Sequence, residues 1–161
     1  MLHVYLSGPI IHENLRKDDF YRAVVSYLAL RGFSVFAPQF FGPAEPVEIY
    51  TRDVKNVRKC DFLIGEVSNP SLGVGMEIML AIELDTPVLL FRHREADPLS
   101  KMVLGADGKA LFEYSSTDEV IQILERIKLE NLVFHYCEKC NTKIAEDVQG
   151  QYRCVQCGID H

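Results

Sequence analysis

The feature that most constrains this chain is a regular alternation of short apolar runs with segments of helical spacing. Strand-length apolar runs lie at residues 3–8, 33–38, 61–67 and 87–91, with a weaker one at 110–114. Hydrophobic residues three and four apart occur in the segments between and after them, at residues 18–32, 47–60, 75–85 and 116–131. This alternation is typical of a mostly parallel sheet with helices on both faces. We therefore expect a doubly wound, Rossmann-like or flavodoxin-like α/β domain with five strands over residues 1–132.

In such sheets, ligands bind beyond the carboxyl ends of the strands. One of the loops expected there, residues 37–48, holds three of the seven prolines and two phenylalanines. Two interpretations stay open for it: a stiff aromatic wall or lid over a site, or an ordinary surface connection with a packed phenylalanine pair.

The last 29 residues, 133–161, are expected to form a separate zinc ribbon. Cys137 and Cys140 form one CxxC pair and Cys154 and Cys157 a second, with thirteen residues between the two pairs. Four thiolates at this spacing can surround one tetrahedral Zn²⁺, and they leave no position for an activated water. The sequence therefore predicts a structural zinc rather than a disulfide pair or a redox motif, with His135 and His161 as bystanders. What the ribbon contacts stays open.

Charge and hydropathy exclude several classes of function. A formal net charge of −6 and no basic face on the ribbon argue against nucleic-acid binding, which needs clustered lysine and arginine. No apolar run approaches the roughly 20 residues of a membrane helix, and the first residues resemble a strand more than a signal peptide. We therefore expect a cytoplasmic protein that binds no membrane and no organic cofactor.

Glu77 stands where a glycine-containing loop meets an apolar segment. If a helix starts near Gly75, its free backbone amides, together with Ser71, Gly73 and Gly75, could hold a phosphate. Glu77 would share a helix face with apolar residues, so its carboxylate would not face solvent. A glutamate in the first turn can also simply complement the helix dipole. Asp53 is a second candidate acid, or else a surface acid paired with Arg52 or Lys55.

Three stretches, "VYLSGPI", "RDVKNVRKCDFLIGEVSNPSLGVGMEI" and "LSKMVLGADG", resemble the nucleoside 2-deoxyribosyltransferase superfamily over residues 3–115. The branch of 2'-deoxynucleoside 5'-monophosphate N-glycosidases is the most similar one. The resemblance implies hydrolysis of the N-glycosidic bond of a nucleoside monophosphate, giving free base and sugar 5-phosphate. It leaves two alternatives: transfer of the sugar to a second base, or a nucleotide sensor without catalysis.

Roles for individual residues come from the same resemblance. Glu77 would be the nucleophile that forms a glycosyl-enzyme ester, Asp53 the acid/base, and Tyr5 the residue that orients Glu77. The substrate-binding residues would be Gly8, Ile10, Ser71, Gly73, Gly75 and Ser100. Ser100 would reach the phosphate from the neighbouring subunit, which implies a homodimer.

This chain departs from the branch after its first strand. Where those glycosidases have a serine and an arginine, it has Pro9, Ile10, Ile11 and His12. His12 could contact phosphate in place of the arginine, or it could simply be exposed. Neither the base preferred nor the choice between ribose and 2'-deoxyribose follows from the sequence.

Overall fold

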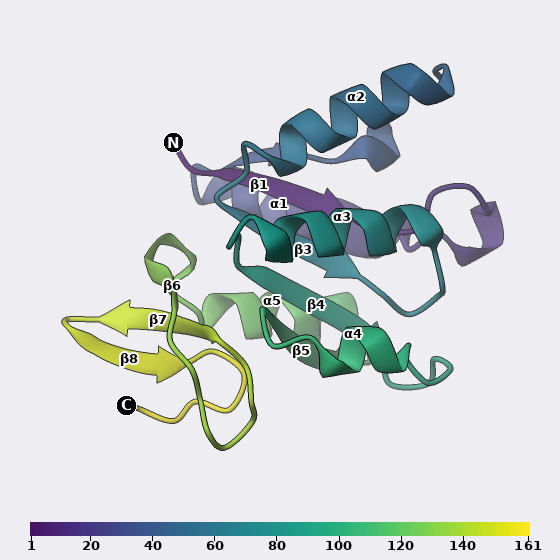
Figure 1. Ribbon diagram of the computed structural model, residues 1–161. Coiled ribbons are helices and arrows are strands. Elements are labelled where there is room, and N and C mark those ends of the chain that lie inside the picture. The colour runs from purple at the N-terminus through teal and green to yellow at the C-terminus, as the bar shows by residue number, and fades with distance from the viewer.

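The computed structural model describes residues 1–161, and its central sheet has five strands, all parallel, in the order β2-β1-β3-β4-β5 (Figure 1). The α/β fold and its five-stranded sheet are thus confirmed. The strands are β1 (His3–Ser7), β2 (Ser34–Phe36), β3 (Phe62–Glu66), β4 (Val88–His93) and β5 (Lys109–Tyr114).

Helices cover both faces of this sheet. α1 (Asp18–Leu30) and α5 (Thr117–Glu125) share a core with one face, and α2 (Pro46–Val57) and α3 (Leu72–Glu83) share a core with the other (Figure 1). None of these helices is both long and apolar enough to cross a bilayer. The remaining helical segments are short: α4 (Lys101–Gly105) and the 3₁₀ turns η1 (Glu13–Leu15), η2 (Pro38–Phe40) and η3 (Leu129–Asn131).

Local sequence signals explain where several helices begin and end. Gly32 follows α1 with φ of 83°, a conformation that a residue with a side chain rarely adopts. Pro46 is the first residue of α2, where its missing N–H costs nothing. Ser116 caps α5, because its side chain accepts a hydrogen bond from the amide of Glu119 at 3.3 Å.

The start of α3 corrects one expectation. The helix begins at Leu72, not near Gly75, and Ser71 caps it by accepting a hydrogen bond from the Val74 amide at 3.4 Å. Gly73 and Gly75 therefore lie inside the first turns of the helix rather than in a preceding loop. Glycine is a weak helix former, and the burial of Val74 in the core offsets its cost.

A second, antiparallel sheet in the order β6-β7-β8 lies next to β5 (Figure 1). Its strands are β6 (Leu132–Phe134), β7 (Ile144–Val148) and β8 (Gln151–Cys154). Together with the four cysteines it makes up the C-terminal ribbon, whose first strand begins at Leu132, one residue before the expected boundary.

The ribbon forms hydrogen bonds with the outer edge of β5. The Leu111 amide donates to the side-chain oxygen of Gln156 at 2.8 Å, and the Thr142 hydroxyl donates to the carbonyl of Lys109. Ile144 is fully buried in the core that α1 and α5 share with the sheet. The ribbon is thus joined to the α/β layers by both hydrogen bonds and core packing.

Candidate active site

Glu77 projects from the second turn of α3 toward β1. Its two carboxylate oxygens accept hydrogen bonds from different side chains of that strand. The Tyr5 hydroxyl donates to Oε1 at 2.8 Å, and the Ser7 hydroxyl donates to Oε2. Tyr5 and Ser7 are both fully buried, and no arginine, lysine or histidine makes an ion pair with Glu77. The carboxylate is therefore held by neutral donors alone.

This environment raises the pKa of Glu77 to about 7. Burial is the largest cause, because it disfavours the charged form. The hydrogen bonds from Ser7 and Tyr5 oppose this effect, and the negative charge of Asp53 adds to it. Burial and the neighbouring carboxylate also raise the pKa of Tyr5, so its phenol stays protonated and acts as a donor. A carboxyl group with a pKa near neutrality is typical of catalytic sites.

Asp53 is the second acid of the group, and it lies on α2. The residue is 8% exposed, and its carboxylate accepts a hydrogen bond from the Arg52 guanidinium at 2.7 Å. The Arg52 guanidinium also lies 4.7 Å from the ring centre of Phe41, in the loop after β2. The ion pair with Arg52 expected for a surface acid is thus present. Asp53 is nevertheless buried, and it lies close enough to Glu77 for its negative charge to raise the pKa of Glu77.

The aromatic loop 37–48 contributes a wall to this group. The ring of Phe36, at the end of β2, lies 5.4 Å from the Tyr5 ring and 5.2 Å from the Phe41 ring. Phe40 and Phe41 remain about half exposed, at 49% and 51%. Aromatic side chains therefore extend from the buried Tyr5 out to the surface.

The expected phosphate-binding residues lie at the start of α3, two to six residues before Glu77. Gly73 and Gly75 are exposed, and nothing lies within 4 Å of where a Cβ would stand at either position. No side chain therefore blocks a ligand from approaching either position, although the Gly75 amide already donates to the Ser71 carbonyl at 3.1 Å. The Ser71 hydroxyl already serves as the helix cap, but a hydroxyl that accepts one hydrogen bond can still donate another.

Gly8 and Ile10 lie in the loop that follows β1. A Cβ at Gly8 would clash with the ring of Tyr21, whose hydroxyl donates to the Pro9 carbonyl at 2.9 Å. Gly8 is therefore required by packing, whatever else it does. Ile10 is half-buried, and His12 is exposed at the start of η1.

Ser100 immediately precedes α4 and is exposed. Its hydroxyl does not cap that helix. The side chain is thus free to contact a ligand or a second chain.

Two residues of this group, Ser7 and Arg52, were not singled out in the sequence. Ser7 could have been recognised from its spacing, because residues two apart on a strand point to the same face. Arg52 was considered only as a surface partner for Asp53. Its stacking on Phe41 depends on the path of a loop, which the sequence does not fix.

A further buried acid, Glu66, lies at the end of β3. Its Oε1 accepts hydrogen bonds from the amide and hydroxyl of Ser68 and, at 3.1 Å, from the Tyr114 hydroxyl. Burial raises the pKa of Glu66, and hydrogen bonds from Ser68 and Tyr114 oppose the shift. Glu66 therefore contacts the loop that follows β3, and it anchors the segment that leads to Ser71.

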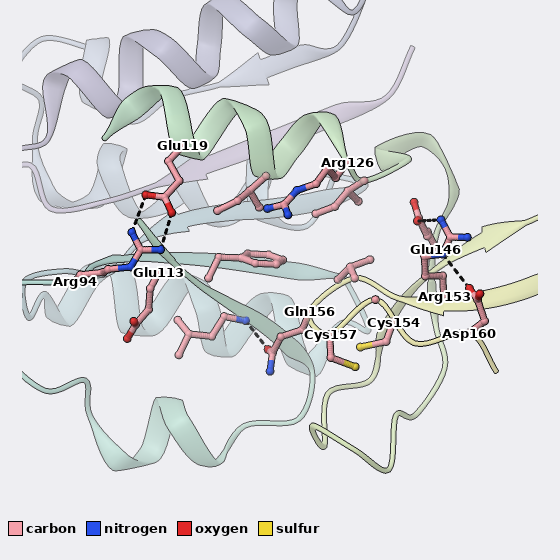
Figure 2. Close-up of a pocket in the computed structure, with 16 residues that line it drawn as sticks. Arg94, Glu113, Glu119, Arg126, Glu146, Arg153, Cys154, Gln156, Cys157 and Asp160 are labelled. Atoms are coloured by element: carbon pink, nitrogen blue, oxygen red, sulfur yellow. Dashed lines mark hydrogen bonds and ion pairs between the residues drawn. The ribbon is translucent and has the colours of Figure 1, made fainter. Parts of the chain in front are cut away.

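A large cavity lies elsewhere, between α5, β5 and the ribbon (Figure 2). Its volume is about 770 Å³, and none of the residues around Glu77 lines it. Most of its charged groups pair with one another: Arg94 with Glu119 at 2.5 Å, and Arg153 with Asp160 at 2.9 Å. Charges that are already paired offer little to a ligand, so we assign no chemistry to this cavity.

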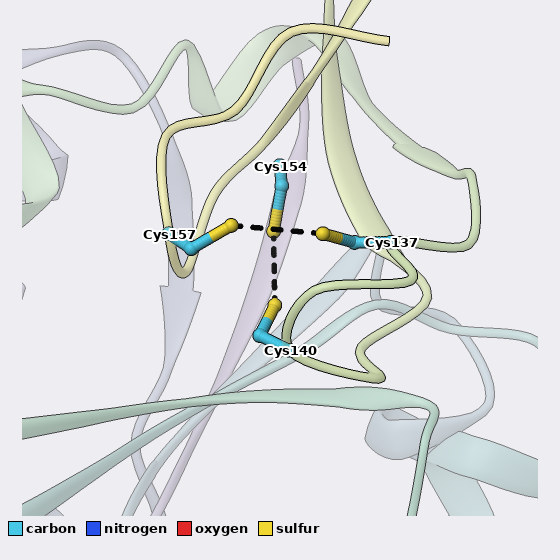
Figure 3. Close-up of side chains that lie close together, drawn as sticks. All are labelled: Cys137, Cys140, Cys154 and Cys157. Carbon is cyan, nitrogen blue, oxygen red and sulfur yellow. Dashed lines mark hydrogen bonds between the residues drawn. The ribbon is translucent and has the colours of Figure 1, made fainter.

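The four cysteines of the ribbon converge on one point (Figure 3). Their sulfur atoms all lie within 4.8 Å of one another, and the Cys137–Cys157 and Cys140–Cys154 pairs are 3.6 and 3.4 Å apart. Disulfide sulfurs lie about 2.05 Å apart, whereas four sulfurs bound to one zinc lie about 3.8 Å apart. This cluster fits a metal ion, and His135 and His161 are not members of it.

The group around Glu77 thus combines a half-buried carboxylate held by two hydroxyls, a second carboxylate, an aromatic wall and an open helix start. A carboxylate so held can attack or stabilise an electron-poor carbon. The second acid can move a proton. Exposed amides at the start of a helix can bind an anion. Together these features fit a reaction at a sugar carbon of a phosphorylated ligand.

Sequence comparisons show which known proteins this chain resembles. A family model described as nucleoside 2-deoxyribosyltransferase matches residues 4–133. A protein of Syntrophotalea carbinolica named "Putative 2'-deoxynucleoside 5'-phosphate N-hydrolase 1" is 40% identical over 132 residues, which are 77% of this chain and 92% of that one. The 5-hydroxymethyl-dUMP N-hydrolase of Danio rerio is 41% identical over 80 residues, which are 48% of this chain but only 56% of that protein.

Solved structures share the fold at low sequence identity. A CMP N-glycosidase of Clostridium botulinum superimposes with a TM-score of 0.60 at 18% identity, covering 76% of this chain and 98% of the other. A 2-deoxyribosyltransferase of Bacillus psychrosaccharolyticus superimposes with a TM-score of 0.58 at 19% identity, covering 91% and 99%.

Proposed function

Because this chain belongs to the nucleoside 2-deoxyribosyltransferase family, we propose that it hydrolyses the N-glycosidic bond of (deoxy)nucleoside 5'-monophosphates. The products are the free base and the sugar 5-phosphate. The observation that carries the proposal is the half-buried Glu77 carboxylate, held by two hydroxyls of β1 beside Asp53. The names of the relatives in Syntrophotalea carbinolica and Danio rerio support hydrolysis and a phosphorylated substrate.

In this reaction, the ionised Glu77 carboxylate attacks the anomeric carbon. The N-glycosidic bond breaks, and its electron pair goes to the base, which takes up a proton. Water then attacks the glycosyl ester, releases the sugar 5-phosphate and regenerates the carboxylate. Asp53 serves as acid toward the departing base or as base toward the water, and such help typically contributes about 10²- to 10⁴-fold to the rate.

Tyr5 orients Glu77 through the hydrogen bond to Oε1. Gly8 and Ile10 contact the substrate near β1, and Ser71, Gly73 and Gly75 receive its 5'-phosphate at the start of α3. The exposed backbone of both glycines supports this role. Since Glu77 lies on the same helix, a phosphate bound there fixes the sugar relative to the nucleophile, and such positioning lowers the barrier.

The test is a product assay over a panel of ribo- and deoxyribonucleotides, with and without the 5'-phosphate. We expect release of free base from a monophosphate and little release from the matching nucleoside. Addition of a second free base should not change the products. Base exchange without net hydrolysis would instead identify a deoxyribosyltransferase. Glu77→Ala should lose turnover and keep nucleotide binding, and a sensor would release no base at all.

We further propose that the protein is a homodimer in which Ser100 of each chain reaches the partner's substrate. Leu72, Met76 and Met79 form an exposed stripe along α3, with exposed fractions of 93%, 62% and 44%. Met102, beside Ser100 on α4, is 77% exposed. Apolar stripes of this kind usually mark an interface.

Mixing two inactive variants tests this arrangement. In a mixture of Glu77→Ala and Ser100→Ala chains, half of the dimers would be mixed, and each of these would contain one complete site. About a quarter of the wild-type activity should then return. If the mixture stays as inactive as its components although light scattering shows dimers, Ser100 does not act across the interface.

For the ribbon, we propose one structural Zn²⁺ held by Cys137, Cys140, Cys154 and Cys157. Four thiolates fill its tetrahedral shell, so the metal contributes to folding and takes no part in the reaction. Metal analysis of the purified chain should find one zinc per molecule.

A further inference from the structure

Ser7 is placed to act on the same carboxylate as Tyr5. Both residues lie on β1, two positions apart, so their side chains point to the same face of the sheet. Tyr5 donates to Oε1 of Glu77, and Ser7 donates to Oε2. We propose that Ser7 is a positioning residue, whose hydroxyl fixes the Glu77 carboxylate and favours its ionised form. This inference rests on the proposed role of Glu77 as the nucleophile.

The need for a second donor follows from the flexibility of a glutamate. The last torsion of a glutamate side chain has broad, roughly two-fold minima, so one hydrogen bond leaves the carboxylate plane poorly fixed. Two donors from one strand, one at each oxygen, define that plane. Ser7 is fully buried, and Glu77 is the one side chain with which its hydroxyl forms a hydrogen bond. The hydroxyl therefore has a strong preference for this partner.

The charges around Glu77 make the two hydroxyls important for its ionisation. From α2 it faces Asp53, which opposes a second negative charge, and Arg52 is already paired with Asp53 at 2.7 Å. From β1 it faces only Tyr5 and Ser7, and no cation pairs with it. Burial and Asp53 raise the pKa of Glu77, and the two hydroxyls lower it. Loss of the Ser7 hydroxyl should therefore raise it further.

The size of the effect can be estimated from hydrogen bonds to charged groups. Removal of one such bond should move the midpoint of Glu77 ionisation upward by roughly one to two pH units. The acidic limb of the kcat/KM profile of Ser7→Ala should shift by the same amount. At pH 6 the variant should therefore lose about tenfold or more relative to wild type, and most of that loss should disappear at pH 9. A purely structural role would reduce activity equally at both pH values.

Direct titration of the Glu77 carboxyl carbon by ¹³C NMR provides the decisive test. Its signal is assigned by its absence from Glu77→Gln, and it is followed in wild type, Ser7→Ala and Ser7→Thr, with Ser34→Ala of β2 as the matched control. We expect the midpoint of the Glu77 titration to move upward in Ser7→Ala and to stay unchanged in Ser7→Thr and Ser34→Ala. If Ser7→Ala does not fold, Ser7→Cys, whose thiol is a weaker donor, should shift part of the way.

An unchanged midpoint in the folded Ser7→Ala variant, or in Ser7→Cys where it replaces that variant, would overturn the inference. The titration needs no turnover, so it separates this inference from the proposed function. If no base is released from any nucleotide while the NMR midpoint still moves, the reaction is wrong and the hydrogen bond from Ser7 to Glu77 still controls the ionisation of Glu77.

Discussion

Replacing Glu77 by glutamine should make the protein more stable at neutral and alkaline pH. The folded protein holds the Glu77 proton more tightly than the unfolded chain, because its pKa rises from 4.5 to about 7. Ionisation therefore disfavours the folded state, and stability is lost as the pH rises from 4.5 to about 7. A difference of about 2.5 units corresponds to about 3 kcal/mol above pH 8.

Glutamine removes this cost and keeps most of the packing. Its oxygen can accept one hydrogen bond, and its NH₂ group can donate to a hydroxyl that has turned to accept. For a chain of 161 residues, 3 kcal/mol corresponds to an upper limit of roughly 6 to 12 °C in Tm. At pH 5 the advantage should shrink to about 1 kcal/mol, since the wild-type carboxyl is then mostly protonated.

Thermal unfolding of wild type and Glu77→Gln at pH 5 and pH 8.5, followed by circular dichroism or calorimetry, measures both values. Glu83→Gln is the matched control, because Glu83 lies on the same helix and is exposed. Its Tm should equal that of wild type at both pH values. If Glu77→Gln gains nothing at pH 8.5, or gains equally at both pH values, ionisation of the Glu77 carboxylate does not limit stability.

Three further results are expected. Asp53→Asn should lower kcat/KM by about 10²- to 10⁴-fold with little change in nucleotide binding, and an unchanged rate would exclude proton transfer by Asp53. Cys140→Ser should lose the bound metal and have a lower Tm, and removal of the metal from the wild type by a strong chelator should lower its Tm as well. One zinc per molecule in the variant would contradict a four-thiolate site. Gln156→Ala should destabilise the fold by about 1 kcal/mol and speed hydrogen exchange at the Leu111 amide, whereas the exposed Gln151→Ala should change neither.

The sequence predicted the layers of the fold well, because its signals for them are local and repeated. The strand runs are mostly apolar, as strands buried on both faces require, and the helices between them have one apolar side. The CxxC spacing brought four cysteines to one point for a similar reason, since each pair lies within a single tight turn. The formation of these elements is determined by residues that lie close together in the sequence.

What the sequence did not predict depends on contacts between distant residues. α4 was missed because five residues are too few to show a helical period. The start of α3 was misplaced because Gly73 and Gly75 suggested a loop, and packing of the helix on the sheet decided otherwise. The Ser7–Glu77 hydrogen bond joins residues 70 positions apart, so only the folded chain reveals it.

The position of the ribbon along β5 has a consequence for self-association. β5 is the last strand of the sheet, and an uncovered strand of this kind is a template for pairing with another molecule. Gln156 and Thr142 occupy the Leu111 N–H and the Lys109 C=O that such pairing would use. A chain cut after residue 132 would keep every residue around Glu77, but it would leave these groups free to pair between molecules. Loss of the ribbon should therefore favour aggregation before it affects the reaction itself.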